Sequence, residues 1–288
     1  MNLMDVIPVD ATLGESPLWD ERNGLLYWID IVGMEVGALS VTTRAWATRP
    51  TPYRYGSLAL TATPGELLAA TAQGLHVIRL TDAGIQIVRS FGDPEAALPG
   101  NRFNDGKTDR QGRFWSGTMD DAETGQRTGS MYRLDTDGSI TKAWSNMGIP
   151  NGLCFSPDGR TMYSADSDDG ELWEAEYDPA TGGAGPRQVL ATVESPGVPD
   201  GSTVDASGGI WSTEWGASRV VRYQPDGTVD AILDVPATQP TCPAFGGPGL
   251  DMLFITTAGL GEDPGTHGGS ILVYEVDVNG IAETPYAG

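Results

Sequence analysis

The segment NDGKTDRQGRFWSGT, residues 104–118, has the layout that decides the fold. It begins with polar residues, continues as a short strand, turns at residues 110–112 and ends in a second, more apolar strand. Glycine-containing turns between two such runs are typical of β-hairpins. The segment therefore predicts a hairpin with a polar front.

The same layout recurs at residues 15–30, 57–71, 151–166, 200–214 and 243–257. The second strand of each of the six segments contains a large residue, and these residues follow at intervals of 41, 47, 48, 48 and 43: Tyr27, Leu68, Trp115, Tyr163, Trp211 and Phe254. Another strand pair fits between successive hairpins, which gives about four strands per unit, as in a propeller blade. The sequence predicts an all-β, six-bladed β-propeller, with residues 1–288 as a single domain. Residues 270–276 are expected to pair with residues 6–11 to close the ring.

The composition limits the classes of partner. The 17 basic and 39 acidic residues give a net charge of −22, which argues against binding to nucleic acid or to an anionic membrane. The two cysteines are far apart and in no metal-binding spacing, so we expect buried thiols in a reducing compartment. The N-terminus has no signal-peptide pattern, and no apolar run is long enough to span a bilayer. We expect a cytoplasmic protein, most simply a monomer.

The first residues of the six segments indicate a metal site. They are Glu15, Ser57, Asn104, Asn151, Asp200 and Pro243. Equivalent positions of the innermost strands surround the axis of a propeller, and four of these six carry oxygen ligands suited to a hard cation. Two carboxylates would balance a divalent ion. The sequence therefore predicts a metal site at the centre of the ring.

A simpler alternative is that Asn104, Asn151 and Asp200 form turns, since Asn-Gly and Asp-Gly are strong turn formers. Their shared register favours the metal site. So does Glu15, a poor turn former whose inward carboxylate needs a partner. Arg102, two residues before Asn104, is either a surface arginine or a fork that holds substrate oxygens.

Other features of the sequence add less. Asp105 is interpreted as a turn residue, and Asp30, Asp166 and Glu214 are expected at the opposite side of the ring, hydrogen-bonded or in solvent. The motifs HExxH, Gly-X-Ser-X-Gly and a GxGxxG that follows a strand are absent. An oxygen-ligated metal is therefore the leading source of catalytic power.

Five segments carry a family resemblance: LGESPLWD (13–20), NRFNDGKTDRQGRFWSGTM (101–119), IPNGLCFSPDGRTMYSAD (149–166), PDGSTVDASGGIWSTEW (199–215) and CPAFGGPGLDMLFITTA (242–258). They resemble the SMP-30/gluconolactonase/luciferin-regenerating-enzyme family over nearly the whole chain. The resemblance implies a six-bladed propeller with metal ligands at Glu15, Asn151 and Asp200. It also implies substrate contacts at Arg102 and Asn104, and Asp200 as the general base.

The implied activity is metal-dependent hydrolysis of a sugar lactone to the aldonic acid, with the lactone as a small-molecule partner. Oxygen ligands suit Ca²⁺, Mg²⁺ or Mn²⁺, and the resemblance adds Zn²⁺ and Fe²⁺. A substrate-contacting glutamate of some members falls on Ala122, so its neighbours Asp121 and Glu123 become the candidates. Two alternatives stay open: a calcium-binding regulator without catalysis, and a phosphotriesterase-like hydrolase that uses the same site.

Overall fold

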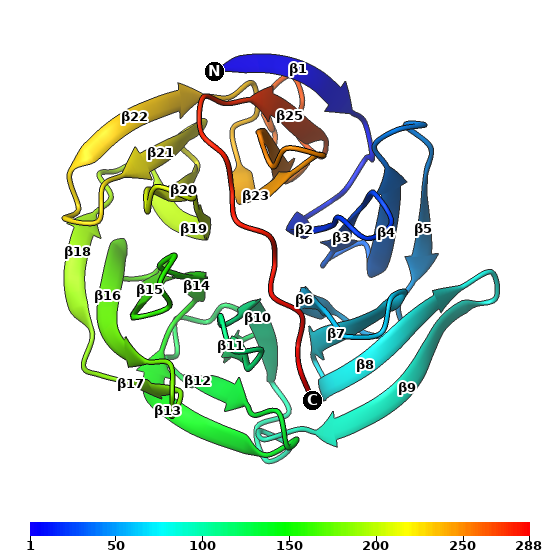
Figure 1. Ribbon diagram of the computed structural model, residues 1–288, viewed down its shortest axis with the longest axis vertical. Coiled ribbons are helices and arrows are strands. Elements are labelled where there is room, and N and C mark those ends of the chain that lie inside the picture. The colour runs from blue at the N-terminus through cyan, green and yellow to red at the C-terminus, as the bar shows by residue number, and fades with distance from the viewer.

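The computed structural model describes residues 1–288 and consists of 25 strands in six antiparallel sheets. The sheets surround one central axis, which confirms the predicted six-bladed β-propeller (Figure 1). The structure contains no helix that is long and apolar enough to cross a membrane.

Each blade is built from strands that follow one another in the chain. Blade 1 consists of β2 (Gly14–Asp20), β3 (Leu25–Asp30), β4 (Glu35–Ser40) and β5 (Trp46–Pro50). Blade 2 consists of β6 (Tyr55–Leu60), β7 (Glu66–Thr71), β8 (Gly74–Thr81) and β9 (Gly84–Gly92). Blade 3 consists of β10 (Asn101–Thr108), β11 (Phe114–Asp120), β12 (Gly129–Leu134) and β13 (Ile140–Met147). Blade 4 consists of β14 (Pro150–Phe155), β15 (Thr161–Asp166), β16 (Glu171–Asp178), β17 (Gly183–Ala184) and β18 (Gln188–Thr192). Blade 5 consists of β19 (Val198–Val204), β20 (Ile210–Trp215), β21 (Arg219–Tyr223) and β22 (Val229–Asp234).

Blade 6 joins the two ends of the chain. It consists of β23 (Pro240–Gly246), β24 (Met252–Thr257), β25 (Ile271–Glu275) and β1 (Asn2–Ile7). The predicted closure is confirmed, because β1 pairs antiparallel with β25 through Val6–Leu272 and Ile7–Ile271. The expected N-terminal range, residues 6–11, was four residues too late.

The hydrophobic core is divided into six clusters, each between two adjacent blades. The large residue repeated in every second strand belongs to the cluster shared with the next blade. For example, Tyr27 of blade 1 packs with Tyr55 and Leu58 of blade 2, and Trp115 of blade 3 packs with Phe155 of blade 4. The repeat therefore marks the residue that joins each blade to its successor.

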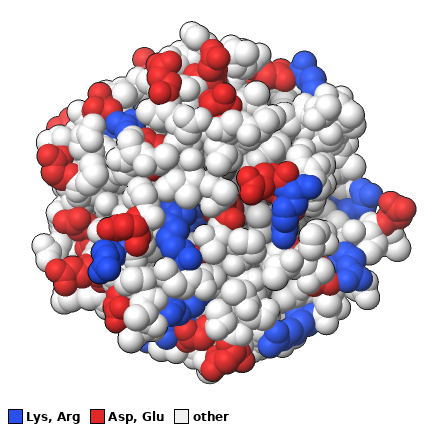
Figure 2. Space-filling model, viewed as in Figure 1, with Lys and Arg blue, Asp and Glu red and all other residues white.

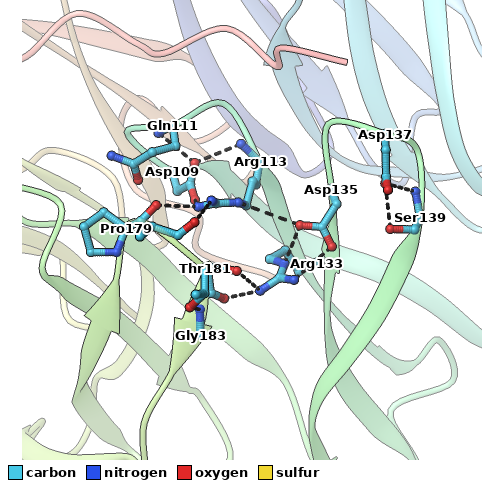
Figure 3. A network of polar contacts seen from close by, with 12 residues as sticks. Asp109, Gln111, Arg113, Arg133, Asp135, Asp137, Ser139, Pro179, Thr181 and Gly183 are labelled. Carbon is cyan, nitrogen blue, oxygen red and sulfur yellow. Dashed lines mark hydrogen bonds and ion pairs between the residues drawn. The ribbon is translucent and has the colours of Figure 1, made fainter.

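Polar contacts add to this packing at the turn end of blades 3 and 4 (Figure 3). Arg113 donates to Asp109 Oδ2 at 3.0 Å and to the Pro179 carbonyl at 3.1 Å. Arg133 donates to Asp135 Oδ2 at 2.9 Å. The bond from Arg113 to Pro179 connects the turn after β10 with the loop after β16. This end of the ring is opposite to the end that carries the polar first residues of the repeats.

The C-terminal segment, residues 277–288, crosses the ring at this same end (Figure 1). Tyr286 N donates to Leu60 O at 2.7 Å, and Ala287 N donates to Gly112 O at 3.0 Å. Glu283 reaches Lys107 of β10, with 2.7 Å between Oε1 and Nζ. Acidic and basic side chains are interspersed on this face, without a continuous basic patch (Figure 2). The two ends of the ring therefore differ, and the opposite end carries the polar fronts.

Candidate functional site

The four polar residues that begin repeated segments, called the polar fronts, line one cavity of about 170 Å³. Glu15 is supplied by β2, Asn104 by β10, Asn151 by β14 and Asp200 by β19. All four side chains are buried, with exposed fractions of 5–8%. The structure therefore brings together the residues that the repeat register selected.

A β-bulge in each innermost strand turns these side chains toward the axis. The pairing register shifts between Glu15 and Leu18 in β2, and between Asn151 and Cys154 in β14. Corresponding shifts occur in β10 and β19. A bulge adds a residue to one strand and re-aims the neighbouring side chains. Ser16 follows Glu15 and Gly152 follows Asn151, and these two residues have left-handed φ values of 49° and 64°.

These bulges correct the interpretation of Asp105 as a turn residue. Asp105 lies inside the bulge of β10, where its Oδ2 accepts from Leu153 N at 2.8 Å and its Oδ1 accepts from Gly106 N at 2.8 Å. Its carboxylate fixes β10 against β14. The Asn-Asp-Gly sequence thus serves a bulge in place of a turn.

The remaining walls of the cavity follow the same repeat. Residues two positions before the fronts form one ring: Leu13, Arg102, Ile149 and Val198. Residues four positions after the repeated large residue form another: Ile31, Met119, Ser167 and Trp215. Glu123 is the one further lining residue. The sequence reasoning missed the second ring, although the 41–48-residue spacing that located the fronts would also have located it.

A chain of hydrogen bonds runs through the site across three blades. Arg102 Nη1 donates to Asn104 Oδ1 at 2.7 Å, and Asn104 Nδ2 donates to Asn151 Oδ1 at 2.8 Å. Asn151 Nδ2 then donates to Ser167 Oγ at 2.9 Å, and that hydroxyl donates to Pro199 O at 2.7 Å. One lone pair of Asn151 Oδ1 and one of Asn104 Oδ1 remain without a protein donor.

The two carboxylates of the site form no salt bridge, although the more distant charge of Arg102 partly offsets the raised pKa of Glu15. Burial raises the pKa of Glu15 well above its ordinary value, and the charges of Asp200 and Asp105 raise it further. Burial, and then the charge of Asp105, raise the pKa of Asp200 in the same way. No lysine or arginine forms a salt bridge with either group. A cation bound between two buried carboxylates without a salt-bridge partner would be stabilised by their charges.

The ligand set that such a cation would find consists of oxygens. No three histidine, cysteine or acidic side chains come together in a metal-binding group anywhere in the chain. A third side-chain ligand is available in Asn151, whose Oδ1 has a free lone pair and which lines the cavity. Carboxylate and amide oxygens fit a hard divalent ion.

Arg102 is fixed by Asp121 on the side away from the cavity, and its guanidinium is accessible from the cavity. Its Nε donates to Asp121 Oδ1 at 2.7 Å, and Asp121 also accepts from Arg54 at 2.6 Å. Its Nη2 has no protein acceptor, and the residue lines the cavity. Asp121, expected to contact substrate, lies outside the lining and supports Arg102. Glu123 lines the rim with a left-handed φ of 50°.

The structure corrects the position expected for Asp30, Asp166 and Glu214. These residues lie at the same end of the ring as the fronts, because Asp30 pairs with Gly14, Asp166 with Pro150 and Glu214 with Pro199. They are hydrogen-bonded, as expected. Asp30 accepts from Leu13 N at 3.0 Å, and Asp166 accepts from Ile149 N at 2.8 Å. Both therefore fix lining residues of the cavity.

The comparison with known proteins agrees with the observed fold. The SMP-30/Gluconolactonase/LRE-like region matches residues 13–259. The chain belongs to this family. One member, L-arabinolactonase of Azospirillum brasilense, is 36% identical over 287 residues, which cover 96% of this chain and 93% of the relative. Regucalcin of Xenopus laevis is 33% identical over 295 residues, which cover 98% and 97% of the two chains.

The family's known structures include a similar propeller. The crystal structure of a calcium-binding protein, regucalcin, from Agrobacterium tumefaciens has a TM-score of 0.90 to this chain at 31% identity. The alignment covers 99% of this chain and 97% of that one. The likeness thus extends over the whole ring, with the N- and C-terminal strands of blade 6.

Proposed function

We propose that the protein hydrolyses a sugar lactone to the aldonic acid, with one divalent metal ion held by Glu15, Asn151 and Asp200. The observation that carries the proposal is a single buried cavity in which two unpaired carboxylates and a free amide oxygen face an open arginine fork. A relative that is 36% identical is named L-arabinolactonase, which supports the substrate class.

The donor set favours hard divalent ions. Ca²⁺, Mg²⁺ and Mn²⁺ prefer oxygen ligands, and Zn²⁺ and Fe²⁺ also bind carboxylates, so all five belong in the test. When bound, such an ion supplies Lewis-acid polarisation of an ester carbonyl. The formal charge of −2 from Glu15 and Asp200 matches a divalent cation.

The side chains around the proposed ion divide the remaining work. Arg102 Nη2 is free to donate to a lactone oxygen, and the free lone pair of Asn104 Oδ1 can accept from a substrate hydroxyl. Both contacts orient the ring and reduce the entropic part of the barrier. The Asp200 carboxylate takes a proton from the attacking water as general base. The oxygen of the water bonds to the carbonyl carbon, the bond between that carbon and the ring oxygen breaks, and Asp200 returns the proton to the ring oxygen, which leaves as the new hydroxyl.

The walls suit a small, uncharged and partly apolar-faced molecule. Leu13, Ile149 and Trp215 exclude water from one part of the cavity, which strengthens polar contacts in the rest. The volume of about 170 Å³ is below the roughly 300–1,000 Å³ of clefts that bind drug-sized ligands. A single sugar ring is the size of substrate that fits this space.

A lactone panel tests the proposal. Purified protein with each of the five ions is offered arabinono-, xylono-, glucono- and galactonolactone in a pH-stat, with spontaneous ring opening subtracted, beside a phosphotriester. The wild type is expected to hydrolyse at least one aldonolactone. Asp200→Asn should lower this rate by at least about 10³-fold, because it removes both the general base and a charged ligand of the ion. The matched control Asp226→Asn changes an exposed acid in the turn after β21 and should retain the rate. Calcium binding without any lactone hydrolysis, or a rate confined to the phosphotriester, would contradict the proposal.

A further inference from the structure

Ser167 is the one polar member of its ring in the cavity. The equivalent positions of the other three site-forming blades carry Ile31, Met119 and Trp215. Ser167 directly follows β15, and its backbone N donates to Ile149 O at 3.0 Å. This bond places the hydroxyl beside the inner strand of blade 4, where it contacts both Asn151 and the Pro199 carbonyl. Ser167 therefore bridges two blades directly beside two of the proposed ion ligands.

The hydrogen-bond chain that passes through Ser167 can run in only one direction. It starts at Arg102, which has donors and no acceptor, and it ends at the backbone carbonyl of Pro199, which has no hydrogen to donate. Asn104, Asn151 and Ser167 lie between these ends, and each accepts from one neighbour and donates to the next. Reversal of either amide would oppose two donors or two acceptors. The chain therefore fixes the amide of Asn151, with its oxygen toward Asn104 and the cavity.

We propose that Ser167 is a positioning residue for the ion site, because its hydroxyl holds the Asn151 amide so that Oδ1 faces the ion. The inference rests on the proposed function. Without the hydroxyl, Asn151 Nδ2 loses its acceptor, so that only the bond from Asn104 Nδ2 still opposes a rotation that would present the NH₂ group to the cavity. A donor at that point repels a cation. Partners that orient metal ligands in this way are worth 10- to 100-fold in metal affinity.

Mn²⁺ affinity of the metal-stripped protein, measured by electron paramagnetic resonance and calorimetry, tests the inference without reference to turnover. Ser167→Ala should bind Mn²⁺ about 10- to 100-fold more weakly than the wild type. Ser167→Thr keeps a hydroxyl and should stay within about threefold. Ser202→Ala is the matched control, because Ser202 lies two residues after Asp200 and its buried hydroxyl has no hydrogen-bond partner. That control should bind Mn²⁺ as the wild type does.

A second pair of variants isolates orientation from simple loss of a contact. In an Asn151→Asp background both side-chain atoms are oxygens, so rotation cannot present a donor to the ion. Ser167→Ala should then change Mn²⁺ affinity by no more than about threefold. Wild-type affinity in Ser167→Ala, or an equal loss in both backgrounds, overturns this inference alone. A wild-type chain that binds no Mn²⁺ overturns the proposed function as well. Circular dichroism melts confirm that each variant is folded.

Discussion

Asp200 combines its proposed role as metal ligand and general base with a cost in stability. Burial raises its pKa in the folded chain, so the folded state holds this proton to higher pH than the unfolded state. A group of this kind stabilises the fold at pH values below its ordinary pKa, near 4, and loses that contribution as pH rises through the raised pKa. The metal-free protein is therefore penalised at neutral and alkaline pH.

Asp200→Asn should consequently raise the melting temperature of the metal-free protein at pH 8 and leave it nearly unchanged at pH 4. Saturating Mn²⁺ should stabilise the wild type and have no effect on the variant, because a ligand stabilises only the state that binds it. Calorimetric scans at the two pH values measure both effects. A variant that is less stable than the wild type at pH 8 would contradict this description of the site.

Arg102 provides a second prediction at this scale. Arg102→Lys keeps the charge but loses the fork that binds Asp121, Asn104 and the cavity together. A charged hydrogen bond is worth about 1.5–3 kcal/mol, so kcat/KM should fall roughly 10- to 150-fold. Arg54→Lys serves as the control, since Arg54 shares Asp121 but does not line the cavity. Equal effects of the two substitutions would argue against a substrate contact at Arg102.

Individual residues also show how far the sequence could go. Glu15, Asn104, Asn151 and Asp200 could be predicted because a repeat with fixed spacing places equivalent positions around one axis. Which of Asp121 and Glu123 lines the cavity could not be predicted. It depends on one left-handed residue at the rim, which turns Glu123 toward the cavity and leaves Asp121 against Arg102.

At the scale of the element, the inner strands depart from regular pairing at the residues that line the cavity. The sequence predicted strands with polar first residues, and Asp105 was interpreted as a turn residue. A bulge and a turn use the same residues, and the difference lies in whether a partner strand continues past them. That pairing involves β11 for β10 and β15 for β14, so local sequence alone does not decide it.

The C-terminal segment gives a prediction about an element. Lys107 and Glu283 form an ion pair with exposed side-chain fractions of 17% and 11%, which ties this segment to β10. Glu283→Gln leaves a largely buried ammonium group without its partner and should cost about 3 kcal/mol in the free energy of unfolding. The double variant Lys107→Met, Glu283→Leu should recover most of this loss. Urea unfolding measures both. A double variant that is less stable than the single one would contradict the role of the pair.

At the scale of the whole molecule, the ring depends on closure by β1. The sequence predicted this closure because the interval between the last and first repeats is longer than the others. It misplaced the strand because residues 6–11 and 2–7 are both short apolar stretches. Ile7 is buried in the cluster between blades 6 and 1, so the strand contributes to the core as well as to the sheet.

Deletion of residues 2–7 should therefore destabilise the entire ring. The loss of Ile7 and of the contacts of Val6 removes at least about 3 kcal/mol of apolar burial, which lowers the melting temperature by roughly 5 °C in a chain of this size. Amide hydrogen exchange should accelerate first in β25, whose outer edge becomes free. An unchanged melting temperature, or exchange that begins in a blade remote from β25, would show that closure does not depend on this strand.

Metal-dependent hydrolysis is tested by titrating metal-stripped protein with Mn²⁺ or Ca²⁺ while hydrolysis of an aldonolactone is followed. A site that holds one ion should give a negligible initial rate, a rise with added ion and saturation at one equivalent per chain, with no rise in Asp200→Asn. A full rate in the stripped protein, or no hydrolysis at any ion concentration, would contradict the proposed function.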